Sequence, residues 1–310
     1  MDVGSAIARG RGQDGSERRL MTRFSITEAG LKGVRLAREH PDVVAVWAVL
    51  YALMGLATAM VSIATMGPQA PAAPEGGAAT TQAVAPFALI MAPLVVVFWA
   101  VVTCAIYRTI LEPQAKGIGR VRLGGAELRM MGLIVILFVI LVVSLWAYHE
   151  ADQFGAITAA TGGLAGAIVG NLVRLAAFAA MSYFWIRMSL AGPDTYASRR
   201  IQVFHSWTLT RGHVWRLAAV YGLALVLAAI VSLVALVVFL VVGLAFAFGS
   251  HADLNHLERV FQPDIRSVAA FFTPAQIFNQ LFSALFLVAV FVVLLSPAAV
   301  IRRDLTAPSG

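Results

Sequence analysis

The chain has 310 residues, of which 60% are hydrophobic and only 13% are charged, and its mean hydropathy is +0.82. Soluble domains carry roughly 25% charged residues, so this composition excludes a soluble globular protein. A formal net charge of +7 is compatible with nucleic-acid binding, but the positions of the basic residues assign them to membrane topology, and we expect no nucleic-acid partner. Cys104 is the only cysteine, which excludes a disulfide or a cysteine-based zinc site within one chain.

The N-terminal region is predicted to lie outside the bilayer. Residues 1–23 are polar and lack the apolar core of a signal peptide, so we expect a disordered cytoplasmic tail. Residues 24–42 are predicted to form an amphipathic helix on the membrane surface, because Ser25-Ile-Thr-Glu28 is a capping box and Pro41 ends the helical pattern. The apolar positions of this helix are Leu31, Val34 and Ala37.

Six apolar stretches follow, and each is long enough for the roughly 20 helical residues that cross a bilayer core. The predicted spans are Val43–Met66, Ala83–Ile110, Leu128–Tyr148, Gly163–Leu190, Val214–Phe248 and Pro274–Ile301. Residues 43–303 therefore form one transmembrane domain, followed by a short cytoplasmic tail at 304–310. The predicted fold is an all-α integral membrane protein with six transmembrane helices in three hairpins and amphipathic segments on the cytoplasmic face.

Lysine and arginine are divided very unequally between the two sides of the predicted spans. Twenty lie in the N-terminal tail, the second and fourth loops and the C-terminus, whereas the opposite side has only Arg259 and Arg266. Because cytoplasmic loops retain positive charge, both termini are predicted to be cytoplasmic, with the protein in the membrane that bounds the cytoplasm. A juxtamembrane Lys or Arg is worth about 1 kcal/mol against an anionic leaflet, so anionic lipids are expected partners.

Each even-numbered span ends in a similar sequence, which we call the exit motif. The second and third copies, Arg187-Met-Ser-Leu190-Ala-Gly-Pro193 and Arg302-Arg-Asp-Leu305-Thr-Ala-Pro308, share R-x-x-L-x-x-P. The first copy, Arg108-Thr-Ile-Leu111-Glu-Pro113, is one residue shorter. Arginine followed by proline is also a common stop signal at a cytoplasmic helix end, but the shared leucine favours a repeated hairpin. We call Arg108, Arg187 and Arg302 the exit arginines.

A segment of mixed polarity precedes each odd-numbered span, which predicts three units of interfacial segment plus hairpin. Before the third span this segment is Gly117–Arg129, whose glycines disfavour a helix. Before the fifth span the apolar members are Val203, Phe204, Trp207 and Leu209. On the opposite side, Gly67–Pro86 is predicted to be flexible, Gly249–Phe272 to hold a short helix at 252–261, and Thr273 to cap the sixth span together with Gln276.

The stretch Ser206-Trp-Thr-Leu-Thr-Arg-Gly-His-Val-Trp215 resembles a family of bacterial six-span proteins related to the membrane domain of glycerophosphoryl diester phosphodiesterases. Those proteins carry a Trp, a Leu and Thr pair and a Gly before the fifth span, and an Arg then a Pro after even-numbered spans. The resemblance implies a six-helix fold and a membrane location. The chain lacks the soluble catalytic domain of the full-length enzymes, with its His-Arg dipeptide and acidic metal ligands, so phosphodiesterase activity is not expected.

Arg174 is the candidate ligand-binding residue, because it lies about eleven residues into the fourth span, where an unpaired guanidinium costs about 2.5–3.5 kcal/mol or more. Gly162, Gly166 and Gly170 lead to it at intervals of four residues, which predicts a face for close helix packing. No acidic residue lies inside another predicted span. We therefore expect Arg174 to point into the bundle and, with Asn171, to bind an anionic group; the alternative is that it snorkels or caps carbonyl groups.

No catalytic or cofactor motif is recognised, since the sequence contains no P-loop, G-x-S-x-G or H-E-x-x-H. Residue types that bind metals lie on two predicted external loops: His149, Glu150 and Asp152, and His251, Asp253, His256 and Glu258. Water-facing loops ordinarily carry such residues, and their spacing matches no metal motif. We therefore predict no catalytic residue, no metal and no cofactor.

The expected function is that of a non-enzymatic inner-membrane protein that interacts with lipids or supports envelope organisation. A second hypothesis is a small transporter with an anion or lipid path at Asn171 and Arg174, although polar residues within the spans are few. A third is a membrane enzyme that modifies lipids near His205 and His213, where no nucleophile and base are paired in the sequence. The glycine face also fits a helix of another protein, so the oligomeric state and protein partners stay open.

Overall fold

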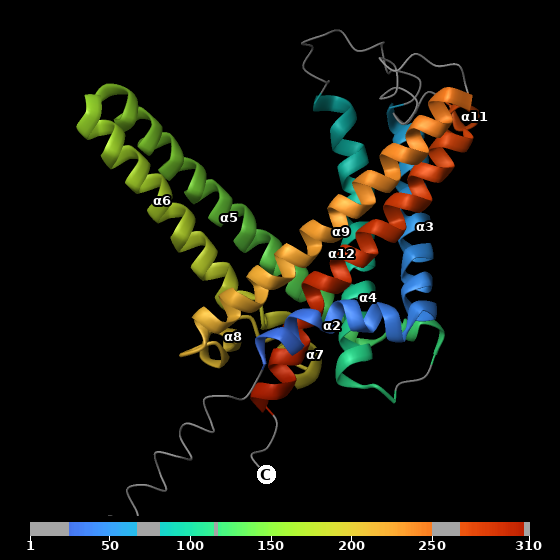
Figure 1. Cartoon of the computed structure of the whole chain (residues 1–310), viewed down its shortest axis with the longest axis horizontal. Coiled ribbons are helices and arrows are strands. Elements are labelled where there is room, and N and C mark those ends of the chain that lie inside the picture. Colours follow the sequence, from blue (N-terminus) through green and yellow to red (C-terminus); the bar gives the residue numbers. More distant parts are fainter. Residues whose placement is uncertain (1–24, 67–80, 115–116, 250–266, 307–310) are drawn as a thin grey trace, which may run out of the picture.

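A computed structural model describes residues 25–66, 81–114, 117–249 and 267–306, and all regular secondary structure in these ranges is helical (Figure 1). Six helices are long and apolar enough to cross a membrane, which confirms the predicted fold class of a multi-pass, all-α membrane protein. These six are α3 (Pro41–Met66), α4 (Thr81–Leu111), α5 (Gly125–Thr161), α6 (Gly163–Met188), α9 (Val214–Gly249) and α12 (Pro274–Thr306). The shorter elements are α2 (Ile26–Glu39), the 3₁₀ turn η2 (Ile118–Arg120), α7 (Ala191–Ser198), α8 (His205–Leu209) and α11 (Val268–Phe271).

Two helices begin as the sequence predicts. The Ser25 hydroxyl accepts a hydrogen bond from the Glu28 backbone N–H at 3.4 Å, which caps α2. The Thr273 hydroxyl accepts from the Gln276 backbone N–H at 3.3 Å, which caps α12. Pro41 occupies the first position of α3, where a missing N–H costs nothing because that group has no partner inside the helix.

The third span is longer than predicted. Helix α5 continues from Tyr148 to Thr161, so the segment that was predicted to be an external loop is helical. The polar run after Tyr148 resembles a loop in composition, but it contains no proline, and the helix ends only at Gly162. His149, Glu150 and Asp152 therefore lie on α5, and the prediction that they belong to an external loop was wrong.

The six long helices form three hairpins, of which α3–α4 and α9–α12 pack together through α12 while α5–α6 diverges from them (Figure 1). Helices α9 and α12 run side by side, and α12 is the most enclosed span, with 56% of its most apolar stretch buried. The α5–α6 hairpin leans away from the other helices, and only 6% of the corresponding stretch of α6 is buried. The core therefore lies around α12, whereas α6 and most of α9 expose apolar side chains suited to contact with lipid.

One end of the molecule is formed by α2, η2, α7 and α8, and we call it the basic end (Figure 1). Helix α2 lies across α9 and α12 there. Glycines permit this contact, because a Cβ on Gly30 would lie 2.6 Å from Leu223 Cδ2 and a Cβ on Gly33 would lie 2.6 Å from Val293 Cα. The amphipathic segment predicted at 24–42 is thus a helix docked on the bundle by its small residues.

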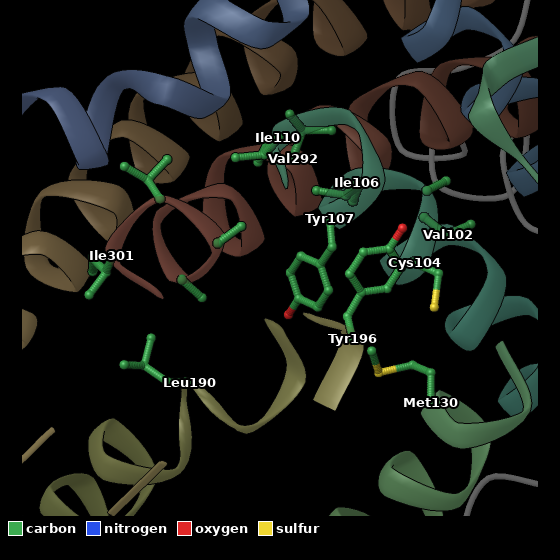
Figure 2. Packing of buried hydrophobic residues seen from close by; sticks show 14 of the residues in the cluster. Val102, Cys104, Ile106, Tyr107, Ile110, Met130, Leu190, Tyr196, Val292 and Ile301 are labelled. Atoms are coloured by element: carbon green, nitrogen blue, oxygen red, sulfur yellow. The ribbon is translucent and has the colours of Figure 1, made fainter. Parts of the chain in front are cut away.

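The buried core at the basic end joins α4, α5, α7 and α12 (Figure 2). The rings of Tyr107 and Tyr196 meet edge to face with their centroids 6.3 Å apart. Gly192 makes room for this pair, since a Cβ there would lie 2.6 Å from the Tyr107 hydroxyl oxygen. Ile106, Leu190 and Ile301 close the same cluster. The interfacial elements are therefore held by a core of their own, in addition to the contacts between the spans.

Several predictions fall partly or wholly outside the described residues. These are the N-terminal tail at 1–23, most of Gly67–Pro86, the short helix at 252–261 and the end of the tail at 304–310. Before the third span, the glycine-rich Gly117–Arg129 contains only η2 and then the first turn of α5, as its glycines suggest. Before the fifth span, the helical part is the five-residue α8.

Candidate functional site

The three exit arginines all lie at the basic end, because α4, α6 and α12 end there (Figure 1). Two of the exit motifs also contact α7. The Tyr196 hydroxyl donates to Glu112 Oε1 at 3.2 Å, which joins the first motif to α7. Asp194 Oδ1 lies 3.5 Å from Arg302 Nε, which joins α7 to the third motif. The repeated sequence pattern therefore corresponds to positions at one end of the molecule, two of which are linked through α7.

Arg108 is buried and has a carboxylate partner. Its Nη2 donates to Glu127 Oε1 at 2.6 Å, and its Nη1 donates to the Arg120 carbonyl at 2.6 Å. The Glu127 side chain is only 2% exposed. A buried guanidinium with such a partner is balanced in charge and in hydrogen bonding, so Arg108 is a structural residue that fixes α4 to the start of α5.

Arg302 shares a buried carboxylate with a histidine. Asp194, whose side chain is 3% exposed, lies 2.8 Å from His205 Nδ1 through Oδ2 and 3.5 Å from Arg302 Nε through Oδ1. At 3.5 Å, Arg302 Nε and Asp194 Oδ1 attract each other as opposite charges but do not form a hydrogen bond. Asp194 therefore joins α7, α8 and α12, and Arg302, like Arg108, has an acidic partner.

Arg187 differs from the other two exit arginines. It is 8% exposed, and its guanidinium carbon lies 4.6 Å from the centroid of the Trp207 ring and 5.4 Å from that of Tyr183. Among the described residues no carboxylate pairs with it, and its buried Nε has no hydrogen-bond partner. Arg187 thus packs against two aromatic rings that also contact each other, with centroids 6.3 Å apart, and its Nε donor is unused.

A cavity of about 600 Å³ lies beside Arg187, between the end of α6 and the start of α9. Its lining residues are Ala179, Ser182, Tyr183, Ile186, Arg187, Gly212, Val214, Trp215 and Ala218. Gly212 has φ +81°, which is favourable for glycine alone and lets the chain turn sharply from α8 into α9. Trp215 is 88% exposed, a position typical of tryptophans at a membrane interface.

The surroundings of Arg187 do not compensate its burial fully. Removing an ion from water costs several kcal/mol, and a desolvated cation–π contact returns about 2 kcal/mol. The aromatic rings offset part of the free-energy cost of burying the charge. They do not satisfy the five guanidinium N–H groups, which need hydrogen-bond acceptors in the plane of the guanidinium group. A buried donor without an acceptor costs about 1–3 kcal/mol more, so the site favours an anionic hydrogen-bond acceptor in the cavity.

The structure places Arg174 differently from the prediction. Its Nε donates to Asp152 Oδ1 on α5 at 2.6 Å, and the Arg174 side chain is 43% exposed on the α5–α6 hairpin. The expectation that it lacks a counter-ion and points into the bundle was wrong, because the span carrying Asp152 extends further than hydropathy indicates. Asn171 is exposed, and its Nδ2 donates to the Ala167 carbonyl of its own helix. Ligand binding at Asn171 and Arg174 stays a prediction.

The glycines before Arg174 lie where α5 and α6 approach each other most closely. Gly162 ends α5, while Gly166 and Gly170 are buried on α6. A Cβ on Gly170 would overlap the Gly155 carbonyl oxygen, and a Cβ on Gly155 would lie 2.6 Å from Arg174 Cγ. In the described structure these small residues serve the contact between the two helices of the hairpin.

We expect Asp152→Asn to destabilise the protein modestly, by about 1 kcal/mol, because Arg174 would lose the counter-ion of a partly exposed ion pair. The midpoint of detergent-induced unfolding measures the loss. The double variant Asp152→Asn, Arg174→Gln removes both charges and is expected to recover most of it. Glu150→Gln, on the same helix and exposed, is the matched control. An Asp152→Asn protein as stable as the control would contradict this account.

Among the described residues, those considered for an enzyme or a metal site are not brought together. His205 bonds Asp194, but among the described residues no serine or cysteine side chain hydrogen-bonds to His205 as a nucleophile would. His213 Nδ1 lies 3.1 Å from the Arg211 carbonyl oxygen, an acceptor to which only the tautomer protonated at Nδ1 is able to donate. Within the described residues no three His, Cys, Asp or Glu side chains are grouped as metal ligands; the predicted loop that carries His251 and His256 lies outside them.

Sequence reasoning missed the site at Arg187, because it treated that residue only as a charge that sets membrane topology. One signal was available. Tyr183 precedes Arg187 by four residues, a spacing that places both on one helix face. Trp207, the other ring, comes from α8 and is brought to Arg187 only by the fold.

No family model, curated protein or solved structure matches the chain. The resemblance at residues 206–215 therefore stays a prediction.

Proposed function

We infer that this chain is a non-enzymatic membrane protein that binds anionic lipids at its basic end. Its six long apolar helices make it a multi-pass membrane protein in contact with a bilayer. The proposal further places it in a bacterial inner membrane, with the basic end in the cytoplasm, as the distribution of Lys and Arg favours.

The observation that carries the proposal is the gathering of exposed arginines around a helix that lies across the spans. Helix α2 is the helix that lies across the spans (Figure 1). The arginines that are not on α2 come after the ends of the spans in the sequence. These exposed arginines are Arg35, Arg38, Arg122, Arg199, Arg200 and Arg211. Arg303 at the same end is also exposed but already pairs with Asp304 at 3.0 Å, so it is not counted among them. At about 1 kcal/mol for each contact with an anionic leaflet, several acting together give a clear preference for anionic over zwitterionic lipid.

Three further features support a role in binding over one in transport or catalysis. Arg174, the residue on which the transporter hypothesis depends, is paired with Asp152 on a hairpin that leans away from the bundle. The resemblance to a phosphodiesterase membrane domain concerns a part of those proteins that does not carry their catalytic residues. The buried polar pairs at the basic end, Arg108 with Glu127 and Asp194 with His205, join helices to one another.

Native mass spectrometry tests the proposal. The purified protein is incubated in mild detergent with equal amounts of phosphatidylglycerol and phosphatidylcholine, and the lipid adducts of each class are quantified. We expect phosphatidylglycerol adducts to predominate. We also expect the excess to shrink as salt increases, because exposed charges are screened. Equal binding of the two lipids would contradict the proposal.

A further inference from the structure

We propose that Arg187 binds the phosphate of an anionic phospholipid whose headgroup occupies the cavity between α6 and α9. This inference rests on the proposed lipid binding and assigns it to one site and one chemical group. No other exit arginine is placed in this way.

The first step in the argument is the contrast within the exit motifs. Arg108 bonds Glu127 at 2.6 Å, and Arg302 lies 3.5 Å from Asp194. Arg187 is nearly as buried as Arg108, at 8% against 5% exposed, whereas the Arg302 side chain is 19% exposed. The buried Nε atoms of Arg187 and Arg302 both lack a hydrogen-bond acceptor, but Arg302 has a carboxylate 3.5 Å away, and among the described residues Arg187 packs on two aromatic rings and pairs with no carboxylate. Arg187 lacks the carboxylate partner that Arg108 and Arg302 each have within the chain, so it is suited to bind the anionic group of a ligand.

The second step is the shape and lining of the cavity. Its volume of about 600 Å³ lies within the roughly 300–1,000 Å³ typical of small-molecule sites. Arg187 supplies a planar fork of donors that matches phosphate oxygens, and Ser182 adds a hydroxyl. The rest of the lining is largely apolar or small, as in Ile186, Val214 and Ala218. Inorganic phosphate would leave these surfaces uncovered, whereas a lipid brings apolar groups with its phosphate.

The third step is access from the bilayer. Helices α6 and α9 meet near the cavity and diverge away from it, so a lipid reaches Arg187 sideways without crossing the bundle (Figure 1). Beyond the cavity both helices expose apolar side chains, among them Leu175 and Phe178 on α6 and Leu225 and Val226 on α9. Trp215 also lines the cavity and is largely exposed, as expected of a tryptophan at a membrane interface. A phosphate at Arg187 thus leaves the acyl chains among lipid-facing side chains.

The experiment compares Arg187→Gln with Arg303→Gln, which removes the same charge from an exposed site at the same end. Each delipidated protein is titrated with phosphatidylglycerol, and the most tightly bound lipid is quantified by native mass spectrometry. We expect Arg187→Gln to weaken this binding about tenfold or more, because a charge-assisted bidentate contact is lost. Arg303→Gln is expected to weaken it less than threefold.

A second variant keeps Arg187 and fills the cavity. Ala179 is exposed and lines the mouth, so Ala179→Phe is expected to fold normally and to reduce the tight binding as Arg187→Gln does. If Arg187→Gln does not fold, the result for Ala179→Phe decides the question.

Three outcomes overturn the inference, and they differ from a failure of the proposed function. If the native protein prefers phosphatidylglycerol but neither cavity variant weakens binding more than Arg303→Gln does, the preference is real and the site is wrong. If glycerol phosphate competes at the same concentration as the lipid, the site binds phosphate but is not a lipid site. If the native protein has no preference for phosphatidylglycerol, the proposed function itself fails.

Discussion

Replacing Glu127 with alanine is expected to destabilise the protein by about 3–5 kcal/mol, which is one of the two largest effects we predict. The Glu127 carboxylate accepts from Arg108 at 2.6 Å, and both side chains are almost fully buried. Without Glu127 the guanidinium stays in an apolar core and loses its carboxylate partner, although the Arg120 carbonyl still accepts from it. The midpoint of detergent-induced unfolding of the purified protein measures the loss.

Two controls separate this effect from the removal of any acidic side chain on α5. Glu150→Ala lies on the same helix but is exposed, and we expect its unfolding midpoint to match that of the native protein. The double variant Arg108→Met, Glu127→Leu replaces the pair with apolar side chains and is expected to recover most of the stability. A Glu127→Ala protein that unfolds with the native midpoint would show that Arg108 does not need its partner.

Hydropathy was sufficient to predict the six spans, because contact with lipid requires continuous apolar surface over a fixed length. It was not sufficient for the end of the third span. A helix is able to continue through polar residues once it leaves the apolar part of the bilayer, and α5 does so from Tyr148 to Thr161. The position of Asp152, and therefore the pairing of Arg174, depended on that boundary.

The exit motifs were visible as a repeat, but their partners were not. Glu127 and Asp194 follow different spans, and the pairing of Asp194 with Arg302 joins residues more than a hundred positions apart. No local pattern indicates such a pair, because only the packing of α7 against α12 brings the two charges together. For the same reason the sequence did not show that Arg187, of the three exit arginines, is the one without an acid.

These observations suggest a division of roles within the repeat. Two exit arginines use their charge to join helices at the basic end, and their carboxylate partners make them unsuited to bind an external anion. The third lies at the junction of two diverging helices, with a cavity beside it and two aromatic rings packed against it. Of the three arginines in the repeated exit motif, Arg187 is therefore the one placed to bind a ligand.

Trp47→Ala is the second change from which we expect a loss of about 3–5 kcal/mol. The Trp47 side chain is 0% exposed, and its Nε1 donates to the Gly119 carbonyl at 2.9 Å. Gly119 has φ +58° and packs so closely on Val46 that a Cβ there would overlap it. Trp47 therefore holds the turn η2 against the start of α3. Its removal leaves both a cavity and a buried carbonyl without a donor.

The size of the side chain and its hydrogen bond are separable in the same measurement. Trp47→Phe keeps most of the ring and loses only the N–H, so we expect a smaller loss of about 1–3 kcal/mol in unfolding free energy. Trp146→Ala, on a face of α5 where that side chain is 65% exposed, should change the unfolding midpoint little.

Because η2 carries Arg120, whose carbonyl accepts from Arg108, the losses of stability caused by Trp47→Ala and Glu127→Ala are expected to be non-additive. Full additivity would mean that the turn and the buried ion pair are independent of each other.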